Sequence, residues 1–180
     1  RELRLPNEKR EIEKLLRQKW KEISRLTILP FWVSERAPTW PDDLSGTIIG
    51  LSQATTAADL LAATVAASFH RLAETLRELE TAAGRATKII VSGGVVQSTV
   101  SLQMLADSLG REVEICAEPE ASLRGAAVHA LEQLGCEVPA AKIKRRLQNR
   151  PLQTAQRRKE AAQQRELEQM LANQYSKREH

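Results

Sequence analysis

The residues of this chain that are best suited to bind a ligand lie in Lys88-Ile-Ile-Val-Ser-Gly-Gly94. The pattern predicts a short buried strand, a tight turn and then a helix. Gly93 and Gly94 have no Cβ and tolerate positive φ, so a flat or charged ligand can approach their backbone closely. The free N–H groups at the start of the next helix suit a phosphate or a polar ring edge. Because many strand-to-helix turns use two glycines for packing alone, this segment by itself leaves both interpretations open.

Other motifs give the glycine turn a context. Upstream lie Leu29-Pro-Phe-Trp-Val-Ser-Glu-Arg-Ala-Pro-Thr-Trp40 and Gly46-Thr-Ile-Ile-Gly-Leu51, and downstream lies Glu120-Ala-Ser-Leu-Arg-Gly-Ala-Ala127. The helix after the turn contains Gln103-Met-Leu-Ala-Asp107. In this order and at these spacings, over about residues 26–135, the chain resembles the C-terminal half of the FGGY carbohydrate kinases. Within that family it is most similar to the gluconokinase and xylulokinase branch.

The resemblance implies a fold and a reaction. The fold is α/β, an actin-like, ribonuclease-H-like ATPase domain that forms the C-terminal half of a two-domain sugar kinase, here with basic helical flanks. In the family, ATP lies in a deep cleft with its adenine side on this domain, and Mg²⁺ and a carboxylate base support transfer to the sugar. The base belongs to the N-terminal half, which this sequence does not contain. The implied ligands are therefore ATP or ADP with Mg²⁺, and a sugar or sugar acid only together with an N-terminal half.

The resemblance also implies a nucleotide site built from two segments. The first is the glycine turn with the polar residues that open the next helix, and the second is the loop that closes the far side of the adenine pocket. The implied contacts are Ser92, Gly93, Gly94, Gln97, Ser98, Glu120, Ala121 and Ser122.

Neighbouring positions carry supporting roles in the same comparison. Gly125 and Ala126 are expected to let their helix pack closely on the sheet. Gln103 and Asp107 are expected to orient neighbouring loops rather than to touch a ligand.

Glu35 and Arg36 match a Glu-Arg pair of the family at the hinge side of the substrate cleft. The pair either shapes the floor of the cleft or forms an internal ion pair that stiffens a proline-rich loop. Asp42, Asp43 and Asp107 are available carboxylates, but none lies at a position that the family uses as the catalytic base. Cys116, Cys136 and the three histidines have no metal-ligand spacing, so no metal site is predicted.

Charge divides the chain into three parts. Residues 1–26 carry nine Lys/Arg and five Asp/Glu, residues 27–136 carry seven and thirteen, and residues 137–180 carry eleven and five. We expect an amphipathic helical segment over 1–26, the nucleotide-binding-type domain over 27–136 and a basic helical tail over 137–180. The flanks are interpreted as solvated helices or as partner-binding surfaces.

The sequence predicts no membrane span and shows no signal peptide. No apolar run approaches the length of a membrane-spanning helix, and the first residues lack the apolar stretch of a signal peptide. The absence of a starting Met suggests a fragment. Two cysteines without Cys-x-x-Cys spacing fit free thiols in a reducing cytoplasm, with Cys116 at the end of a buried strand.

Periodicity predicts alternating helices and strands. Helices are expected over 8–25, from Thr56 to Ala83, and over 98–109 and 121–134, with strands over 47–51, 87–91 and 112–116. The long helix should begin with a capping box between Thr56 and Asp59. Its apolar stripe is expected to be Leu60, Leu61, Thr64, Val65, Phe69, Leu72, Leu76 and Leu79. From 139 to 177 the chain reads as helix, broken near Pro151.

Three functions compete at this point. The first is the nucleotide-side half of an ATP-dependent carbohydrate kinase, inactive alone. The second is a non-catalytic kinase remnant that acts as an interaction module, with Phe31, Trp32 and Val33 exposed and driving self-association. The third, nucleic-acid binding through the basic flanks, is disfavoured because Tyr175 is the only aromatic residue of 137–180.

Overall fold

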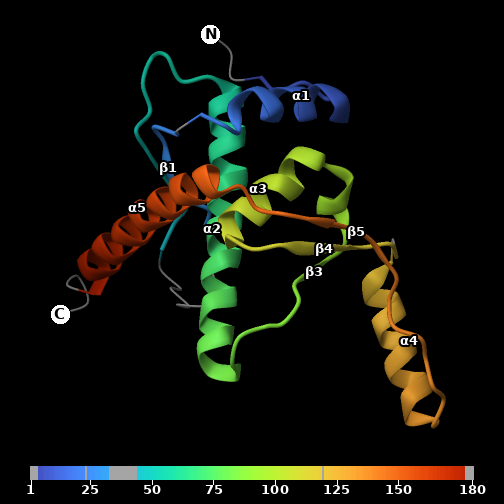
Figure 1. The fold of residues 1–180 in the computed structure, drawn as a ribbon. Helices are drawn as coiled ribbons and strands as arrows, with labels where there is room; N and C mark the ends of the chain where they lie inside the picture. The colour runs from blue at the N-terminus through green and yellow to red at the C-terminus, as the bar shows by residue number, and fades with distance from the viewer. Residues whose placement is uncertain (1–3, 23, 33–43, 119, 177–180) are drawn as a thin grey trace.

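The computed structural model describes residues 4–22, 24–32, 44–118 and 120–176. Helices and strands alternate along most of the chain, as the periodicity predicts (Figure 1). In order they are α1 (Lys9–Lys19), β1 (Thr27–Leu29), β2 (Thr47–Ile49), α2 (Ala57–Ala83), β3 (Ile90–Val91), the 3-10 turn η1 (Gly94–Gln97), α3 (Thr99–Leu109), β4 (Val113–Cys116), α4 (Ala121–Gln133), β5 (Ile143–Leu147) and α5 (Pro151–Ser176).

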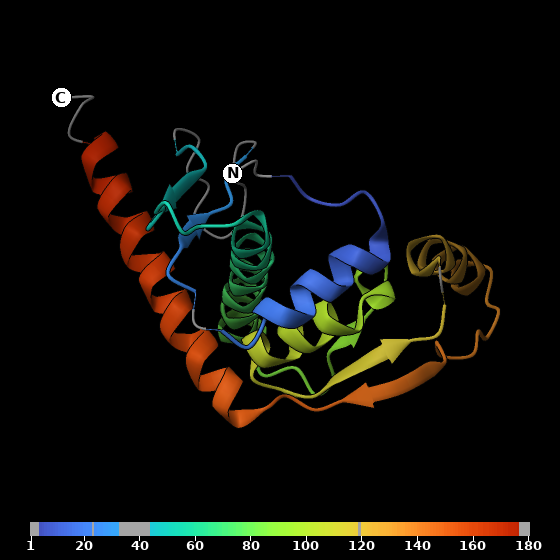
Figure 2. The same cartoon turned by 90° about the horizontal axis from the view of Figure 1, so that it is seen from above.

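The strands form two small sheets. β1 and β2 pair antiparallel, and the second sheet has the order β3-β4-β5. β3 and β4 run parallel, with Val91 opposite Ile115, and α3 makes the crossover between them. β5 lies antiparallel on the other side of β4. Figure 2 shows this sheet below α1 and α3, so one face of it is covered by helices.

Helix α2 runs through the centre of the fold (Figure 1). It begins with the expected capping box, in which the Thr56 side chain accepts from the Asp59 N–H and the Asp59 carboxylate accepts from the Thr56 N–H. It ends at Gly84, whose φ is 85°. The predicted apolar stripe is partly wrong, since Leu72 and Leu79 are 52% and 60% exposed. The buried face of α2 is instead formed by four alanines together with three larger residues. These residues are Ala62, Ala63, Ala66, Ala67, Phe69, His70 and Arg71.

The main core joins α1, α2 and α3 to one face of the β3-β4-β5 sheet. Leu16 and Trp20 of α1 pack with Phe69 of α2 and with residues of α3 and the strands. Leu102, Met104 and Val113 are completely buried in this cluster. Cys116 is buried at the end of β4, as its position in the sequence predicts. The charged helix α1 is therefore anchored by an apolar face and supports α3 from one side.

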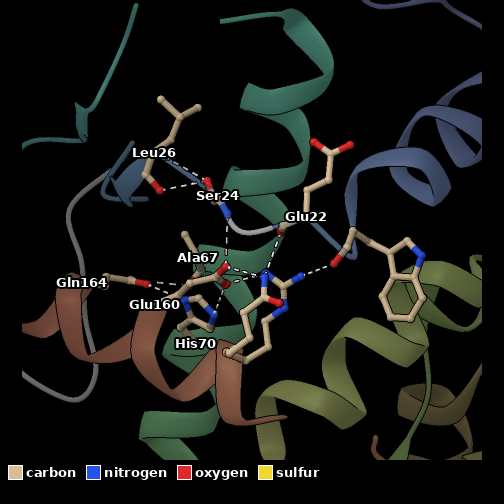
Figure 3. Close-up of polar contacts among 10 residues, drawn as sticks. Glu22, Ser24, Leu26, Ala67, His70, Glu160 and Gln164 are labelled. Carbon is tan, nitrogen blue, oxygen red and sulfur yellow. Dashed lines mark hydrogen bonds and ion pairs between the residues drawn. The ribbon is translucent and has the colours of Figure 1, made fainter. Parts of the chain in front are cut away.

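Helix α5 closes the other side of α2 with buried polar residues. Figure 3 shows Glu160 of α5 between His70 of α2 and the segment of Glu22 and Ser24 that leads to β1. Arg157, only 4% exposed, pairs with Glu160 and donates to the carbonyl of Trp20. Glu160 also accepts from the Ser24 N–H at 3.4 Å. One buried ion pair thus joins α5 to Trp20 and Ser24, which lie 137 and 136 positions away in the sequence.

His70 is neutral within this cluster. Burial lowers the pKa of its ring to about 4, which outweighs the attraction of Glu160, 3.7 Å from Nε2. Its Nδ1 lies 3.1 Å from Oε1 of Gln164, so the neutral ring can donate there. A second buried ion pair, Arg71 to Glu168 at 2.7 Å, extends the polar contact along α2 and α5.

The C-terminal half of α5 adds a small apolar cluster. Leu167 packs with Leu29, Phe31 and Leu44, all nearly or fully buried. The prediction that Phe31 is exposed and drives self-association is therefore wrong, because α5 covers it. Trp32 is 56% exposed, and Val33 lies outside the described residues.

Two boundary predictions also need correction. Helix α1 ends at Lys19 rather than near residue 25, and β5 occupies part of the segment expected to be helical. Within the part of the chain that the structure describes, no helix is long and apolar enough to cross a bilayer.

The buried ion pair makes a testable prediction. Replacing Arg157 with Met should lower the free energy of unfolding by about 3 kcal/mol or more, because Glu160 would remain buried without its partner. Replacing the exposed neighbour Arg158 with Met should change it by less than about 0.5 kcal/mol. Urea unfolding followed by circular dichroism measures both. Equal stability of the two variants would contradict the role given to Arg157.

Candidate functional site

The candidate nucleotide segments meet at one edge of the β3-β4-β5 sheet. Because β3 and β4 are parallel with Val91 opposite Ile115, the residues that follow both strands emerge at the same end. Ser92, Gly93 and η1 follow β3, and the segment leading to α4 follows β4. Ligands of open α/β sheets bind outside the carboxyl ends of such strands. The topology therefore brings both segments implied by the resemblance to a common edge.

The glycine turn is open to solvent. Gly93 has φ 78°, which favours glycine, and a Cβ built on Gly93 or Gly94 meets no atom within 4 Å. Ser92, Gly93 and Gly94 are all exposed. Contacts within the chain therefore do not require glycine at position 94, and they do not cover the backbone of this turn. An external flat group can lie directly against this turn.

Helix α1 holds the residues that follow the turn. Glu13 accepts from the Ser98 hydroxyl at 2.5 Å, the Thr99 hydroxyl at 2.9 Å and the Val100 N–H at 3.1 Å. Lys9 lies 3.5 Å from Oε1 of Gln97. Gln97 and Ser98, both expected at the nucleotide, are thus engaged by α1.

The carboxylate of Glu13 occupies the amino end of α3, where an anionic ligand would otherwise bind. Burial opposes its ionisation, but the hydrogen bonds from Ser98, Val100 and Thr99 outweigh this and lower its pKa. Glu13 was not anticipated from the sequence. The available signal was the spacing of Lys9, Glu13 and Arg17, four residues apart on one helix face. Because this end of α3 is already neutralised, the edge suits an uncharged part of a ligand.

The second segment starts an unusual helix. Glu120 is the N-cap residue of α4 without a side-chain cap, and Ala121 and Ser122 form its first turn. α4 has no buried residue and extends away from the rest of the fold (Figure 1). A Cβ on Gly125 meets no atom within 4 Å. The expectation that Gly125 and Ala126 pack α4 closely on the sheet is therefore wrong for this chain.

Gln103 and Asp107 act on a neighbouring loop, as expected. Gln103 donates to the carbonyl of Gln148 at 2.9 Å and to Asp107 at 3.1 Å. Asp107 is fully buried and accepts from the Arg150 N–H at 2.7 Å. Burial raises the pKa of Asp107 despite these contacts. The two residues fix the connection between β5 and α5.

A cavity among the described residues lies elsewhere. It has a volume of about 290 Å³ and is lined by residues around Lys19, Leu26, Asp59 and Arg157. Its lining includes none of the predicted nucleotide contacts. At the sheet edge itself, Ser92, Gly93 and Gly94 are exposed.

The remaining candidates can be placed briefly. Glu35 and Arg36 lie outside the described residues. Among the residues that the structure describes, no group of three or more His, Cys, Asp or Glu could hold a metal ion.

The sequence comparisons show the family. Residues 2–133 match the model for the FGGY family of carbohydrate kinases, C-terminal domain. A glycerol kinase of Nitrosomonas eutropha is 33% identical over 118 residues, which cover 60% of this chain and 24% of that protein. One of Alteromonas mediterranea is 30% identical over 120 residues, covering 67% and 24%. The chain thus spans about a quarter of the length of these relatives.

Solved structures confirm the expected fold. A gluconate kinase from Lactobacillus acidophilus superposes with a TM-score of 0.79 at 20% identity, covering 93% of this chain and 35% of that one. A xylulose kinase from Rhodospirillum rubrum gives 0.77 at 21% identity, with 93% and 35% covered. The α/β, actin-like ATPase fold of a sugar-kinase C-terminal domain, predicted from the motifs, is therefore confirmed.

The hydrogen bonds of Glu13 lead to a testable prediction for this site. Replacing it with Ala should lower the free energy of unfolding at neutral pH by about 1–2 kcal/mol, because an ionised acceptor of three hydrogen bonds is lost. Replacing the exposed Glu11 of the same helix should cost less than about 0.5 kcal/mol.

The effect should also depend on pH. The folded state lowers the pKa of Glu13, so its contribution is present above the ordinary pKa and disappears as pH falls through the folded value. The free energies of unfolding of the native chain and of the Ala variant should become equal in acid. A constant difference across this range would contradict the assignment.

Proposed function

Because this chain belongs to the FGGY family of carbohydrate kinases as a C-terminal domain, we propose that it is the nucleotide-side half of an ATP-dependent carbohydrate kinase. The reaction is transfer of the terminal phosphoryl group of ATP to a hydroxyl of a sugar or of a sugar acid such as gluconate. The nucleotide contacts lie within residues 27–136, with 1–26 and 137–180 as supporting flanks.

One observation carries the proposal. The parallel pairing of β3 and β4 brings the open glycine turn and the start of α4 to the same sheet edge. Gly93 and Gly94 offer bare backbone to a flat ring, while Ser92 offers an exposed hydroxyl beside it. This arrangement suits the base and ribose of ATP or ADP.

The chemical contribution of this half is positioning. Glu13 neutralises the amino end of α3, so the phosphates extend away from that helix toward the missing half. Gln97 and Ser98, held by α1, form the wall between the nucleotide and the helix. Glu120, Ala121 and Ser122 close the opposite side of the base.

When bound with the nucleotide, Mg²⁺ would supply neutralisation of the phosphate charge. The described residues offer no cluster that could hold it, so no step is assigned to residues of this chain through the metal. None of them corresponds to a base that accepts the sugar proton. The chain alone is therefore inactive in this account.

The acceptor binds only when an N-terminal half is present. This chain resembles proteins named glycerol kinase, xylulose kinase and gluconate kinase. Their names indicate a polyol, a sugar or a sugar acid as the acceptor of the phosphoryl group. Glu35 and Arg36 are proposed to face this substrate cleft. The compartment proposed for the protein is the cytoplasm, and neither a membrane nor nucleic acid is proposed as a partner.

The second candidate is a non-catalytic interaction module. It is favoured by α4 and its C-cap residue, since Leu123, Leu131 and Leu134 are 69%, 41% and 78% exposed. This candidate predicts self-association without nucleotide binding.

Calorimetric titration with ADP and adenosine tests the nucleotide half. The native chain should bind both, and Gly94→Trp should weaken binding by about tenfold or more, because the indole fills the space left open at the turn. Ala82→Trp, an exposed position in the last turn of α2, is the matched control and should bind normally.

Two results would contradict the proposal. One is the absence of binding by a folded native chain, and the other is binding that Gly94→Trp leaves unchanged. Sugar phosphorylation by the chain alone would contradict the inactivity assigned to it.

A further inference from the structure

The ring of His70 in α2 faces polar groups of α5 with both of its nitrogen atoms (Figure 3). Nδ1 lies 3.1 Å from Oε1 of Gln164, and Nε2 lies 3.7 Å from Oε2 of Glu160. His70 and Glu160 are both buried, at 7% and 9% exposure. The first distance is that of a hydrogen bond, whereas the second is too long for one. Nε2 of His70 therefore has no hydrogen-bond partner among the described residues.

The side-chain amide of Gln164 determines which nitrogen of the ring carries the proton. The amide nitrogen of Gln164 donates to the carbonyl of Ala67 at 3.4 Å, so its oxygen faces the ring of His70. An amide oxygen can only accept a hydrogen bond, and Nδ1 of His70 must therefore donate to it. In a neutral imidazole the other nitrogen then carries a lone pair. Nε2 of His70 is thus a hydrogen-bond acceptor.

Two acceptors consequently face each other across 3.7 Å, Nε2 of His70 and Oε2 of Glu160. Arg157 donates to the same carboxylate oxygen at 2.5 Å. The other oxygen of Glu160 accepts from the Ser24 N–H and from the Gln156 side chain. Arg157 uses one lone pair of Oε2 and leaves a second one free. A buried acceptor without a donor is destabilising, so both atoms require a donor between them.

A small cavity adjoins both acceptors. Its volume is about 20 Å³, and it is lined by residues of α2, α5 and the segment 24–28, with His70, Glu160 and Gln164 among them. A site must offer about 10–15 Å³ and at least two polar partners to hold one water molecule. The cavity meets both conditions and leaves no room for an organic ligand.

We propose that one water molecule is bound between α2 and α5, where it donates one hydrogen to Nε2 of His70 and the other to Oε2 of Glu160. Water has two hydrogens to donate, which matches the two acceptors at the cavity. A bridging water is nearly as favourable in enthalpy as a direct hydrogen bond. The water joins the two helices beside the ion pair of Arg157 and Glu160, so it completes the hydrogen bonding of that buried carboxylate. The inference is independent of the proposed function.

Two other protonation states of the ring are poorer alternatives. A proton on Nε2 would leave Nδ1 as an acceptor, and Gln164 could donate to it only by turning its oxygen toward the carbonyl of Ala67. A charged ring would satisfy Gln164 and Glu160 together. However, burial lowers the pKa of His70 to about 4 despite the attraction of Glu160, whose charge is already paired with Arg157.

Long-range nitrogen–proton correlation spectra of the labelled full chain test the tautomer. At slightly alkaline pH, His70 should show a protonated Nδ1 and an unprotonated Nε2. The exposed His129 is the internal reference and should show both neutral forms in exchange. A proton on Nε2 of His70, or a charged ring, overturns the proposal.

Nuclear Overhauser spectra of the same chain test for the water molecule itself. The ring protons Hδ2 and Hε1 of His70 flank Nε2, and both should show cross-peaks at the water frequency. Thr27→Val removes the hydroxyl group of a residue that lines the cavity, and the cross-peaks should persist in this variant. Their absence from the native chain, or their loss with the Thr27 hydroxyl, overturns the proposal.

Replacement of Gln164 tests the link between the tautomer and the water. Gln164→Leu removes the acceptor of the Nδ1 proton, so His70 should shift toward the form protonated on Nε2 and the water cross-peaks should be lost. Gln163→Leu is the matched control, because Gln163 is an exposed neighbour that lines the same cavity, and it should keep both signals.

Circular dichroism confirms that each variant is folded. An unchanged tautomer with unchanged water cross-peaks in folded Gln164→Leu contradicts the proposal. The two measurements on the native chain test it without any substitution.

Discussion

The buried ion pair of Arg157 and Glu160 is the constraint on which the arrangement of this chain depends. The pair lies in α5, but its hydrogen bonds reach the end of α1 at Trp20 and the segment before β1 at Ser24. Charged groups removed from water are costly unless they are fully paired, so these contacts specify one position for each segment. With α1 fixed in this way, its Glu13 is held at the amino end of α3. A contact about 20 residues from the C-terminal end of the fold thereby influences the proposed nucleotide edge.

That edge has the character of half a site. The glycine turn is open, and the cavity around Lys19, Leu26, Asp59 and Arg157 lies elsewhere. In the proposed function this half supplies open backbone and positioning. The exposure of α4 has the same cause, because a helix that packs against no other element exposes the apolar residues that it carries.

Local rules predicted much of this structure. The Thr56 and Asp59 capping box follows from side chains three residues apart, and the glycine turn follows from its own backbone requirements. The common edge of the two nucleotide segments follows from alternating strands and helices. Distant contacts were not predictable in this way. Phe31 is buried by Leu167, which lies far along the chain, and β5 forms from a basic sequence because β4 offers Glu114 to Arg146. Glu13 was missed because a charge on an amphipathic helix is usually solvated. The projection of α4 was missed because motifs do not report what a helix packs against.

The position of bound nucleotide on the described surface is the central claim, and nitrogen–proton correlation spectra of the labelled chain measure it residue by residue. With ADP, the account predicts that amide signals of Ser92, Gly93, Gly94 and Gln97 shift together with those of Ala121 and Ser122. The signals of Lys19, Asp59 and Ala62 around the large cavity should stay in place. Shifts confined to that cavity, or spread without preference over the basic segments, would contradict the account.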